Sequence, residues 1–288
     1  MTAPTKAISE GLTYAGLGYY NSDNILTGGT PTAPANGAAA SDFAEILGAR
    51  TMAPTTPDPE TVQITAEELL GEFTLPSTAS RAFVAELAAL DMTMIDNIQN
   101  TLSYALAGAR FAAEDIEDVP ETDTCLIINA RTKKQDVGVK GKKAWSGAVI
   151  PVATAKWLGR DSYNARNGAS YRLSLNPQSA DQAPWGITMQ DILGTPGARR
   201  LPFTGDYPYW LASARGDGST PTFVVRHRPV SAALAAAIVI PPPYATGGAA
   251  VAVASVNRTA PYSITLGSNP ATGAAICLLY AFDSFTRS

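Results

Sequence analysis

The chain has 288 residues, of which 45% are hydrophobic and 16% are charged, and its net charge is −4. A chain of this length can form one large domain or two modest ones, and it can bury enough apolar surface to fold without disulfides. No apolar run reaches the roughly 18 residues of a membrane-spanning helix. The N-terminal MTAPTKAISEG lacks a basic-then-apolar signal pattern, so we expect no export by that route.

Residues 1–56 are predicted to form an N-terminal arm. The stretch GLTYAGLGYYNSDNILTGGTPTAPANGAAASDF is rich in Gly, Ala, Asn and Pro and shows little sustained periodicity. It is too apolar to be assigned to disorder and too interrupted for a compact domain, so we expect it to become ordered against a neighbour. Three prolines in the following APTTPDPETVQIT favour an extended run into a strand at Val62–Thr65.

Residues 57–211 are predicted to form a mixed, mostly β domain. The alternation in GEFTLP predicts a strand over 71–76. The stretch 81–90 fits either a helix or a strand. Apolar residues that then recur at three and four residues predict a short helix over 92–102.

Three strong strand patterns follow an acidic loop at 114–123. They are TCLIINART, AWSGAVIPVATAKWLG and ASYRLSLNP. Proline cannot donate to a ladder, so Pro151 predicts that the second of these strands is kinked or lies at an edge.

Five of the seven lysines stand in one stretch, RTKKQDVGVKGKKAW, between the first two of these strands; they are Lys133, Lys134, Lys140, Lys142 and Lys143. Gly138 and Gly141 supply turn freedom, so the stretch is predicted to be a hairpin loop. It would attract nucleic-acid phosphates, although Trp145 is its one aromatic for base stacking. The alternative partner is acidic groups of another copy, with Glu114, Asp115, Glu117 and Asp118 as first candidates.

The charge is divided unevenly along the chain. Residues 1–124 carry 18 acidic and 4 basic side chains, a net charge of −14, whereas residues 125–288 carry 7 acidic and 17 basic, a net charge of +10. Such a division suits contact between copies, basic face to acidic face. The two parts can equally neutralise each other within one fold.

The C-terminal part, 212–288, reads as a series of short strands with turn pairs every 8–12 residues, which is typical of a small β-sandwich. We therefore expect a domain boundary near residue 211. Within this part, the Arg-Gly-Asp of ARGDGST is interpreted first as a turn. Cys125 and Cys277 lie in apolar runs and are expected to be buried free thiols in separate elements.

Catalytic patterns are weak. His227 is the only histidine, and arginines flank it in VVRHRPV; nearby positive charge lowers the pKa of an imidazole and makes it a poor general base. The neighbouring acidic pairs Glu67/Glu68 and Glu117/Asp118 diverge on either kind of element. GVKGKK lacks the GxxxxGK[ST] spacing of a phosphate loop. We expect no catalytic residue, metal or cofactor.

The order of these pieces resembles the tail tube (major tail) proteins of long-tailed bacteriophages. The likeness is carried by LGARTMAPTTPDPETVQIT, by DTCLIINARTKKQDVGVKGKKAWSGAVIPVATAKWLG, by YRLSLNPQSADQAPWGITM and by GDGSTPTFVVRHRPV. It covers most of residues 45–230. The strongly acidic first half and the IPPP at 240–243 depart from the family pattern.

The resemblance implies a structural protein of the virion, assembled in the bacterial cytoplasm. Its fold would be mainly β: a tail-tube-type β-sandwich or barrel (57–211) with a flanking short helix and long loops, an inter-ring connecting arm (1–56), and an exterior immunoglobulin-like β-sandwich (212–288). Its partners would be copies of itself in stacked hexameric rings and other tail proteins at the tube ends. Phage DNA would pass through the lumen without specific binding during ejection.

Two alternatives stay open. One is another virion component, a head decoration or baseplate protein. The other is a nucleic-acid-binding module that uses the 133–143 lysine loop.

Overall fold

The chain is mainly β, as the sequence predicted. The computed structural model describes residues 7–23, 25–46, 49–54, 60–66, 69–75, 83–87, 92–99, 104–106, 109–111, 122–134, 143–160, 171–178, 199–244 and 248–284. Among these residues the strands form several antiparallel sheets, accompanied by the helix α1 (Met92–Gln99) and a short 3₁₀ turn, η1 (Ala232–Leu234).

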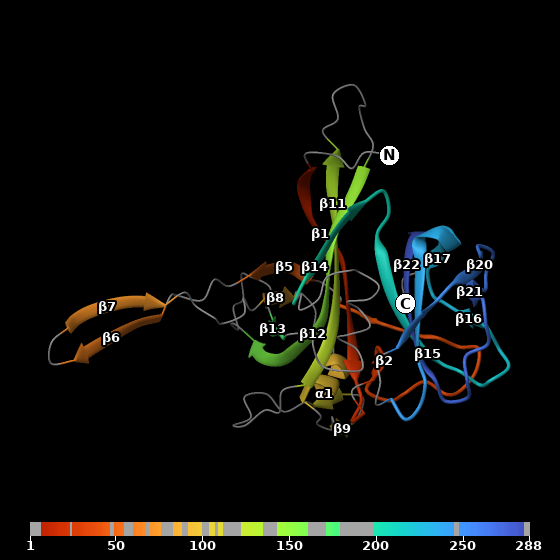
Figure 1. Ribbon diagram of the computed structural model, residues 1–288, viewed down its shortest axis with the longest axis horizontal. Coiled ribbons are helices and arrows are strands. Elements are labelled where there is room, and N and C mark those ends of the chain that lie inside the picture. The colour runs from red at the N-terminus through yellow and green to blue at the C-terminus, as the bar shows by residue number, and fades with distance from the viewer. Residues whose placement is uncertain are drawn as a thin grey trace.

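The largest sheet has nine strands among the described residues, in the order β2-β1-β11-β12-β13-β8-β5, with β4 also paired to β1 and β14 to β12 (Figure 1). The strands are β1 (Ala7–Tyr20), β2 (Leu26–Gly28), β4 (Ala44–Glu45), β5 (Ala49–Pro54), β8 (Phe83–Leu87), β11 (Thr122–Lys134), β12 (Lys143–Arg160), β13 (Tyr171–Pro177) and β14 (Leu201–Gly205).

A second sheet has the order β19-β18-β22-β15-β3, with β17 on β22, and a third has the order β16-β21-β20. Their strands are β3 (Ser41–Asp42), β15 (Tyr209–Arg215), β16 (Thr222–Val224), β17 (Arg228–Pro229), β18 (Ala235–Ile240), β19 (Ala249–Val251), β20 (Val253–Asn257), β21 (Ser263–Leu266) and β22 (Ala275–Ser284). Two hairpins complete the described strands: β6 (Glu60–Ala66) with β7 (Leu69–Leu75), and β9 (Tyr104–Leu106) with β10 (Ala109–Phe111).

The central strands of the large sheet are buried on both faces. Side chains alternate across a strand, so in β1 Tyr14 and Tyr20 enter one core while Leu17 and Tyr19 enter the other. The run Cys-Leu-Ile-Ile in β11 divides in the same way. A continuous run of apolar residues is therefore expected in these strands, as in other strands that are covered on both faces.

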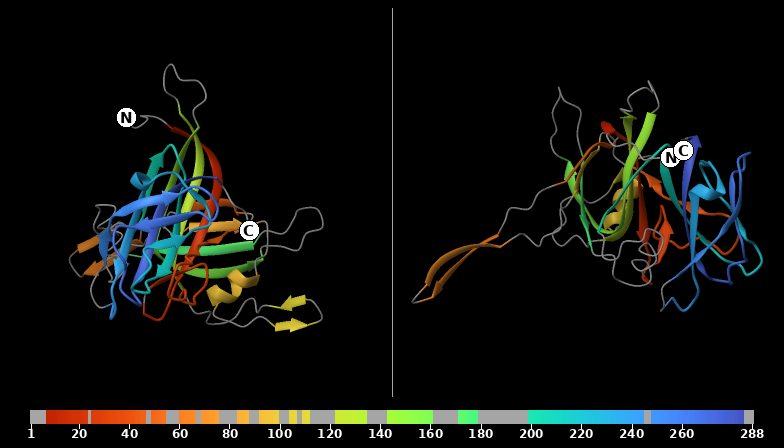
Figure 2. Two further views of the ribbon diagram at one scale, coloured as in Figure 1. Left: turned by 90° about the vertical axis from the view of Figure 1, so that its right-hand side faces the viewer. Right: turned by 45° about the horizontal axis from the view of Figure 1, so that its top comes forward.

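One core lies between the large sheet and the two C-terminal sheets. It joins Tyr14, Cys125 and Val149 of the large sheet to Trp210 and Leu278 of the second sheet. The other core lies under α1, whose buried residues stand three and four apart; they are Met94, Ile95 and Ile98. Because one face of β1, β11, β12, β13 and β8 contributes to this core, the sheet curves around the helix (Figure 2).

Two expectations need correction. The first 56 residues do not form an arm in their described part, because Ala7–Tyr20 pairs along its length with β11 and its residues from Tyr14 to Tyr20 are buried. The boundary expected near residue 211 falls inside β15, and the strands on either side of it share a core. Of the two alternatives predicted for Pro151, the edge position does not apply, because β12 is an inner strand with β11 on one side and β13 and β14 on the other.

Pro151 is accommodated in β12 by a β-bulge. The register to β11 shifts between Thr124 and Leu126, which pair with Ala153 and Ile150. Pro151 thus lies where the ladder is interrupted, and between the stretches that pair with β14 and β13. This is one of the few inner positions that proline tolerates.

The predicted strands and helix that fall on described residues are confirmed, whereas the acidic loop expected at 114–123 lies outside them up to residue 121, and β11 begins at Thr122. The strands expected at 62–65 and 71–76 form β6 and β7, and the ambiguous 81–90 contains β8. The predicted helix is α1, although it ends at Gln99.

Candidate assembly surfaces

The lysine hairpin, residues 131–145, is built on one of the two long ladders of the large sheet, that of β11 and β12. β11 and β12 are antiparallel, and their last described pair brings Lys133 opposite Lys143. β1 runs beside them, with Ala7 opposite Lys134. This end of the sheet projects from the top of the molecule (Figure 1). The hairpin topology predicted from the sequence is confirmed for these strands.

The remaining predicted site residues lie outside the described residues. They are Lys140, Lys142, Glu114, Asp115, Glu117 and Asp118. The structure therefore brings Lys133, Lys134 and Lys143 together and leaves their proposed pairing with the 114–118 carboxylates as a prediction.

Trp145, the aromatic considered for base stacking, is not an open platform. It is 9% exposed. The Arg131 guanidinium lies over its ring, 5.4 Å from the centroid, and the two residues are cross-strand partners. This cation–π contact belongs to the base of the lysine hairpin, so the nucleic-acid reading loses its stacking group.

The structure contains a second projecting element, which the sequence did not identify as a separate arm. The acidic hairpin, residues 60–75, consists of β6 and β7, which pair only with each other among the described strands. It extends away from the body of the molecule in Figure 1 and in the right panel of Figure 2. Its sequence holds four acidic residues and no basic one; they are Glu60, Glu67, Glu68 and Glu72.

The register of the acidic hairpin separates apolar from polar positions. Val62, Ile64 and Ala66 lie opposite Phe73, Gly71 and Leu69, whereas Thr61 and Gln63 lie opposite Thr74 and Glu72. Alternate residues of a strand share a face, so one face of this hairpin is nearly all apolar in sequence and the other mainly polar.

His227 is fully buried in an aromatic cluster. Its Nε2 is hydrogen-bonded to the Tyr14 hydroxyl at 3.0 Å, its ring stacks on Phe282 with centroids 4.6 Å apart, and Trp210 meets it edge-on. Burial, assisted by the neighbouring Arg226 charge, lowers the pKa of His227 to about 3. The imidazole is therefore neutral at ordinary pH and acts as packing between the sheets.

A short segment beside this cluster crosses from one sheet to the other. β3 pairs with β15 of the second sheet, and β4, two residues on, pairs with β1 of the large sheet. Phe43 between them is 1% exposed and packs against Trp210. We call residues 41–45 the crossing segment.

Two carboxylates of the crossing segment face Arg226. The Arg226 backbone N–H donates to Asp42 Oδ2 at 3.0 Å, and its guanidinium Nη2 lies 3.7 Å from Glu45 Oε2. Burial raises the pKa of Asp42 to about 7, in spite of the opposing effect of Arg226. A partly charged carboxylate is thus held at the junction of the sheets.

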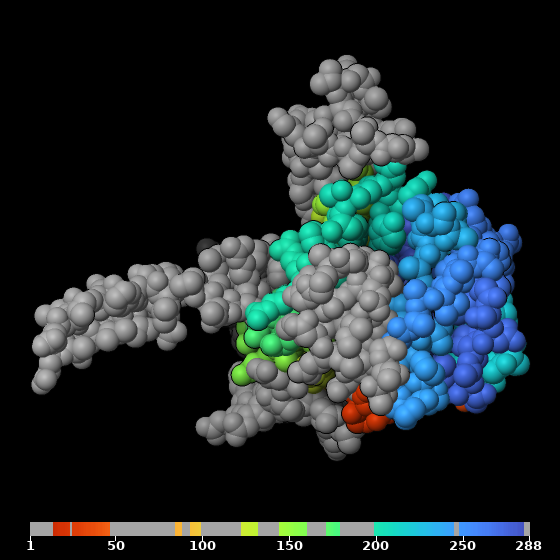
Figure 3. Space-filling view, viewed as in Figure 1, coloured from red at the N-terminus to blue at the C-terminus, as the bar shows by residue number. Residues whose placement is uncertain are grey.

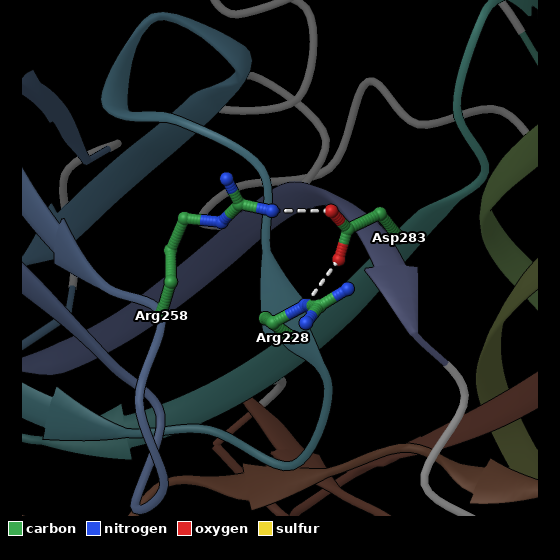
Figure 4. Close-up of polar contacts among 3 residues, drawn as sticks. All are labelled: Arg228, Arg258 and Asp283. Atoms are coloured by element: carbon green, nitrogen blue, oxygen red, sulfur yellow. Dashed lines mark hydrogen bonds and ion pairs between the residues drawn. The ribbon is translucent and has the colours of Figure 1, made fainter.

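On the surface, Asp283 near the end of β22 holds two arginines (Figure 4). Its Oδ1 accepts from Arg228 Nε at 2.6 Å, and its Oδ2 accepts from Arg258 Nη2. This hydrogen bonding raises the pKa of Arg228. These two ion pairs connect β22, which carries Asp283, to β17 and to the turn that follows β20. All three side chains are accessible to solvent.

The Arg-Gly-Asp tripeptide forms the predicted turn. Asp217 Oδ1 accepts from the backbone N–H groups of Ser219 and Thr220, at 2.8 and 2.6 Å, and Oδ2 from the Thr220 hydroxyl. These bonds hold the pKa of Asp217 well below its usual range. The carboxylate is engaged in shaping the turn before β16.

Both cysteines are buried free thiols in separate strands, as predicted, and burial raises the pKa of each. In the described part of the chain, His, Cys, Asp and Glu side chains do not gather in a group that could hold a metal ion. No helix among the described residues has the length and apolarity that crossing a membrane requires.

No protein-family model, curated protein or solved structure matches the chain. Function must therefore be inferred from the two projecting hairpins and the sheets that carry them. The sequence already contained a signal for the second hairpin, since its acidic residues and alternating apolar residues occur together, but alternation alone does not say whether a strand pair joins the main sheet.

Proposed function

We propose that the chain is a structural subunit that assembles with copies of itself, and specifically a tail tube protein of a long-tailed bacteriophage. In this proposal hexameric rings stack into a hollow tube that conducts DNA into the host. We also propose that the strands form a tail-tube-type β fold with a flanking helix and that the protein is located in the virion tail.

The observation that carries the proposal is the acidic hairpin. A two-stranded hairpin alone is at best marginally stable in water, and it needs further strands or a packed face. β6 and β7 pair with no further strand among the described residues, and one of their faces is nearly all apolar in sequence. A partner molecule that covers this face would satisfy both needs.

Further support comes from the kind of surface that the chain offers. It is mainly β, with two hairpins that leave the body in different directions (Figure 1), and its charge is divided between −14 and +10. An acidic lining would also suit a conduit, because it would repel the phosphates of passing DNA. The resemblance of the ordered sequence segments to tail tube proteins selects this assembly among others.

The test is negative-stain microscopy and sedimentation velocity of the purified chain. Rings or tubes of even bore are expected, and replacement of residues 60–75 by a Gly-Ser linker should yield a folded, non-assembling monomer with a β-type circular dichroism spectrum. A chain that stays monomeric at high concentration contradicts the proposal. Assembly of closed shells or attachment to preformed heads would favour a decoration protein instead.

A further inference from the structure

The acidic hairpin and the lysine hairpin have opposite charge. Residues 60–75 carry four acidic and no basic side chains, a net charge of −4. Residues 131–145 carry five lysines and Arg131 against the single Asp136, a net charge of +5. Each hairpin therefore concentrates charge of one sign in about 15 residues.

The described strands of the two hairpins do not pair with each other within one molecule. β6 and β7 pair only with each other, whereas β11 and β12 pair within the large sheet. Figure 1 and the right panel of Figure 2 show the acidic hairpin extending sideways while the paired ends of β11 and β12 lie at the top of the body. A complementary surface for each hairpin is thus available on a second copy.

We propose that the acidic hairpin of one copy docks on the lysine hairpin of the next. This inference rests on the proposed function and names the two surfaces that meet. The described residues that carry it are Glu72, on the polar face of the acidic hairpin, and Glu60, which begins β6 on the other face opposite Leu75. Their partners are Lys133, Lys134 and Lys143 at the ends of β11 and β12. The 114–118 carboxylates, which lie outside the described residues, stay the alternative partner for the lysines.

Such a contact is heterologous, because the two surfaces differ. Heterologous contacts between identical subunits close into rings or propagate as filaments, depending on the rotation between neighbours. Each exposed ion pair is worth only about 0–1 kcal/mol. Repetition around a ring multiplies this small amount, while the apolar face of the acidic hairpin is covered at the same step.

Charge also predicts how the contact responds to salt. Electrostatic complementarity governs encounter and register, and at 1 M salt the screening length falls to about 3 Å. Assembly should therefore be slower in high salt. In a variant whose acidic or lysine hairpin has been neutralised, the assembly rate should depend less on salt than in the wild type.

The decisive experiment exchanges the charges. Lys133→Glu with Lys143→Glu, or Glu60→Lys with Glu72→Lys, should each raise the concentration needed for assembly by about tenfold or more. The chain that carries all four changes should recover assembly, because attraction is restored with the signs reversed. Lys156→Glu with Arg199→Glu is the matched control: both residues are exposed and lie outside the lysine hairpin, and the change in net charge equals that of the lysine pair.

The outcomes separate this inference from the proposed function. If the wild-type chain never assembles, both are overturned. If it assembles and replacement of 60–75 abolishes assembly, but the two charge-reversed pairs behave like the control, the acidic hairpin docks elsewhere and the inference fails. If the lysine pair changes only the retention of the chain on duplex DNA, the lysine hairpin serves nucleic acid and the inference fails as well.

Discussion

Asp42 and His227 show how single buried ionisable groups set the response of this protein to pH. Burial keeps the imidazole neutral and favours the protonated form of the carboxyl, so the pKa of His227 falls to about 3 while that of Asp42 rises to about 7. The unfolded chain titrates both groups near their ordinary values. Stability therefore depends on pH through both groups, with opposite signs.

The signs follow from which state holds the proton. As pH falls from 6.5 towards 3, the unfolded chain protonates His227 and the folded chain does not, so stability declines. As pH rises from 3.8 to 7, the unfolded chain loses the Asp42 proton before the folded chain does, so stability again declines. Between pH 4 and 6.5 the two effects offset each other.

Asp42→Asn should remove the decline in stability that Asp42 causes as pH rises. The variant is expected to gain stability as pH rises from 4 to 6.5 and then to level off, as His227 alone requires. Relative to the wild type, it should be more stable at pH 8 than at pH 4 by on the order of 1–3 kcal/mol. Urea denaturation at a series of pH values measures this; parallel curves for the two proteins would show that Asp42 titrates normally.

Glycines in β1 permit the close approach of the two sheets. A Cβ on Gly16 would lie 2.3 Å from the Trp210 ring, and one on Gly18 would lie 2.4 Å from the Phe43 ring. Both aromatic side chains are almost fully buried, so they have no open space to move into. The absence of a side chain at these positions is therefore a packing requirement.

Gly16→Ala should destabilise the fold by about 1–3 kcal/mol, the usual cost of overpacking a core. The matched control is Gly205→Ala, because the nearest atom to a Cβ at Gly205 is 3.9 Å away. Thermal and urea denaturation compare the two. Equal stability of both variants would mean that Trp210 moves aside at little cost.

At the scale of elements, Asn129 fastens the large sheet to the second sheet. The buried amide of Asn129 in β11 donates to the Tyr209 carbonyl at 2.9 Å and accepts from the Tyr209 N–H at 3.0 Å. One side chain thus replaces a pair of ladder hydrogen bonds between β11 and β15, strands that belong to different sheets.

Asn129→Ala should cost about 2–4 kcal/mol, because it removes two hydrogen bonds and leaves a backbone pair unsatisfied in the interior. Asn257 offers a control: it bonds to Pro261 and Thr259 in the same manner but is exposed. Water can replace its partners, so Asn257→Ala should cost clearly less. Similar losses for both variants would show that burial does not decide the effect.

Elements with their own periodicity were predictable from sequence, and those that depend on distant partners were not. α1, β11 and the hairpin that carries the lysines follow from spacing and turn residues. β1 was misread because Gly16 and Gly18 interrupt its alternation, and their reason lies in Trp210 and Phe43, which no local pattern reveals. Pro151 predicted either a kink or an edge position, and the sequence could not choose between them because a bulge depends on the partner strand.

The candidate surfaces divide in the same way. The sequence identified the lysine hairpin, because the clustering of its lysines can be recognised without the structure. It did not identify the acidic hairpin as an arm, because a strand pair that leaves the body and one that joins a sheet have the same alternation. Only the pairing partners of β6 and β7 distinguish them.

For the whole molecule, the shared core makes the described strands one cooperative body. Residues from β1, β11 and β12 meet residues from β15, β21 and β22 in a single cluster. In Figure 3 the teal and blue surface of residues 200–284 adjoins the red surface of residues from the first 46. Two-state unfolding is the expectation for such a core, in contrast to two separate transitions for independent domains.

A fragment ending at residue 211 should therefore fail to fold. It would expose the apolar face of the large sheet and retain only the beginning of β15, so we expect aggregation or loss of the near-ultraviolet circular dichroism signal. A chain ending at Ser284 keeps all the described strands and serves as the control. Soluble, cooperatively unfolding 1–211 would instead show that the large sheet is autonomous.

The position of β22 has a consequence for how the protein is made. This last described strand pairs with β15, β17 and β18, and β15 in turn receives the crossing segment from about 170 residues earlier in the chain. The central core therefore cannot close on the ribosome until β22 has emerged. Pairings across such sequence separations fold slowly, and unfinished chains present apolar strands. We expect dependence on chaperones during synthesis to be greatest just before residue 275 is translated.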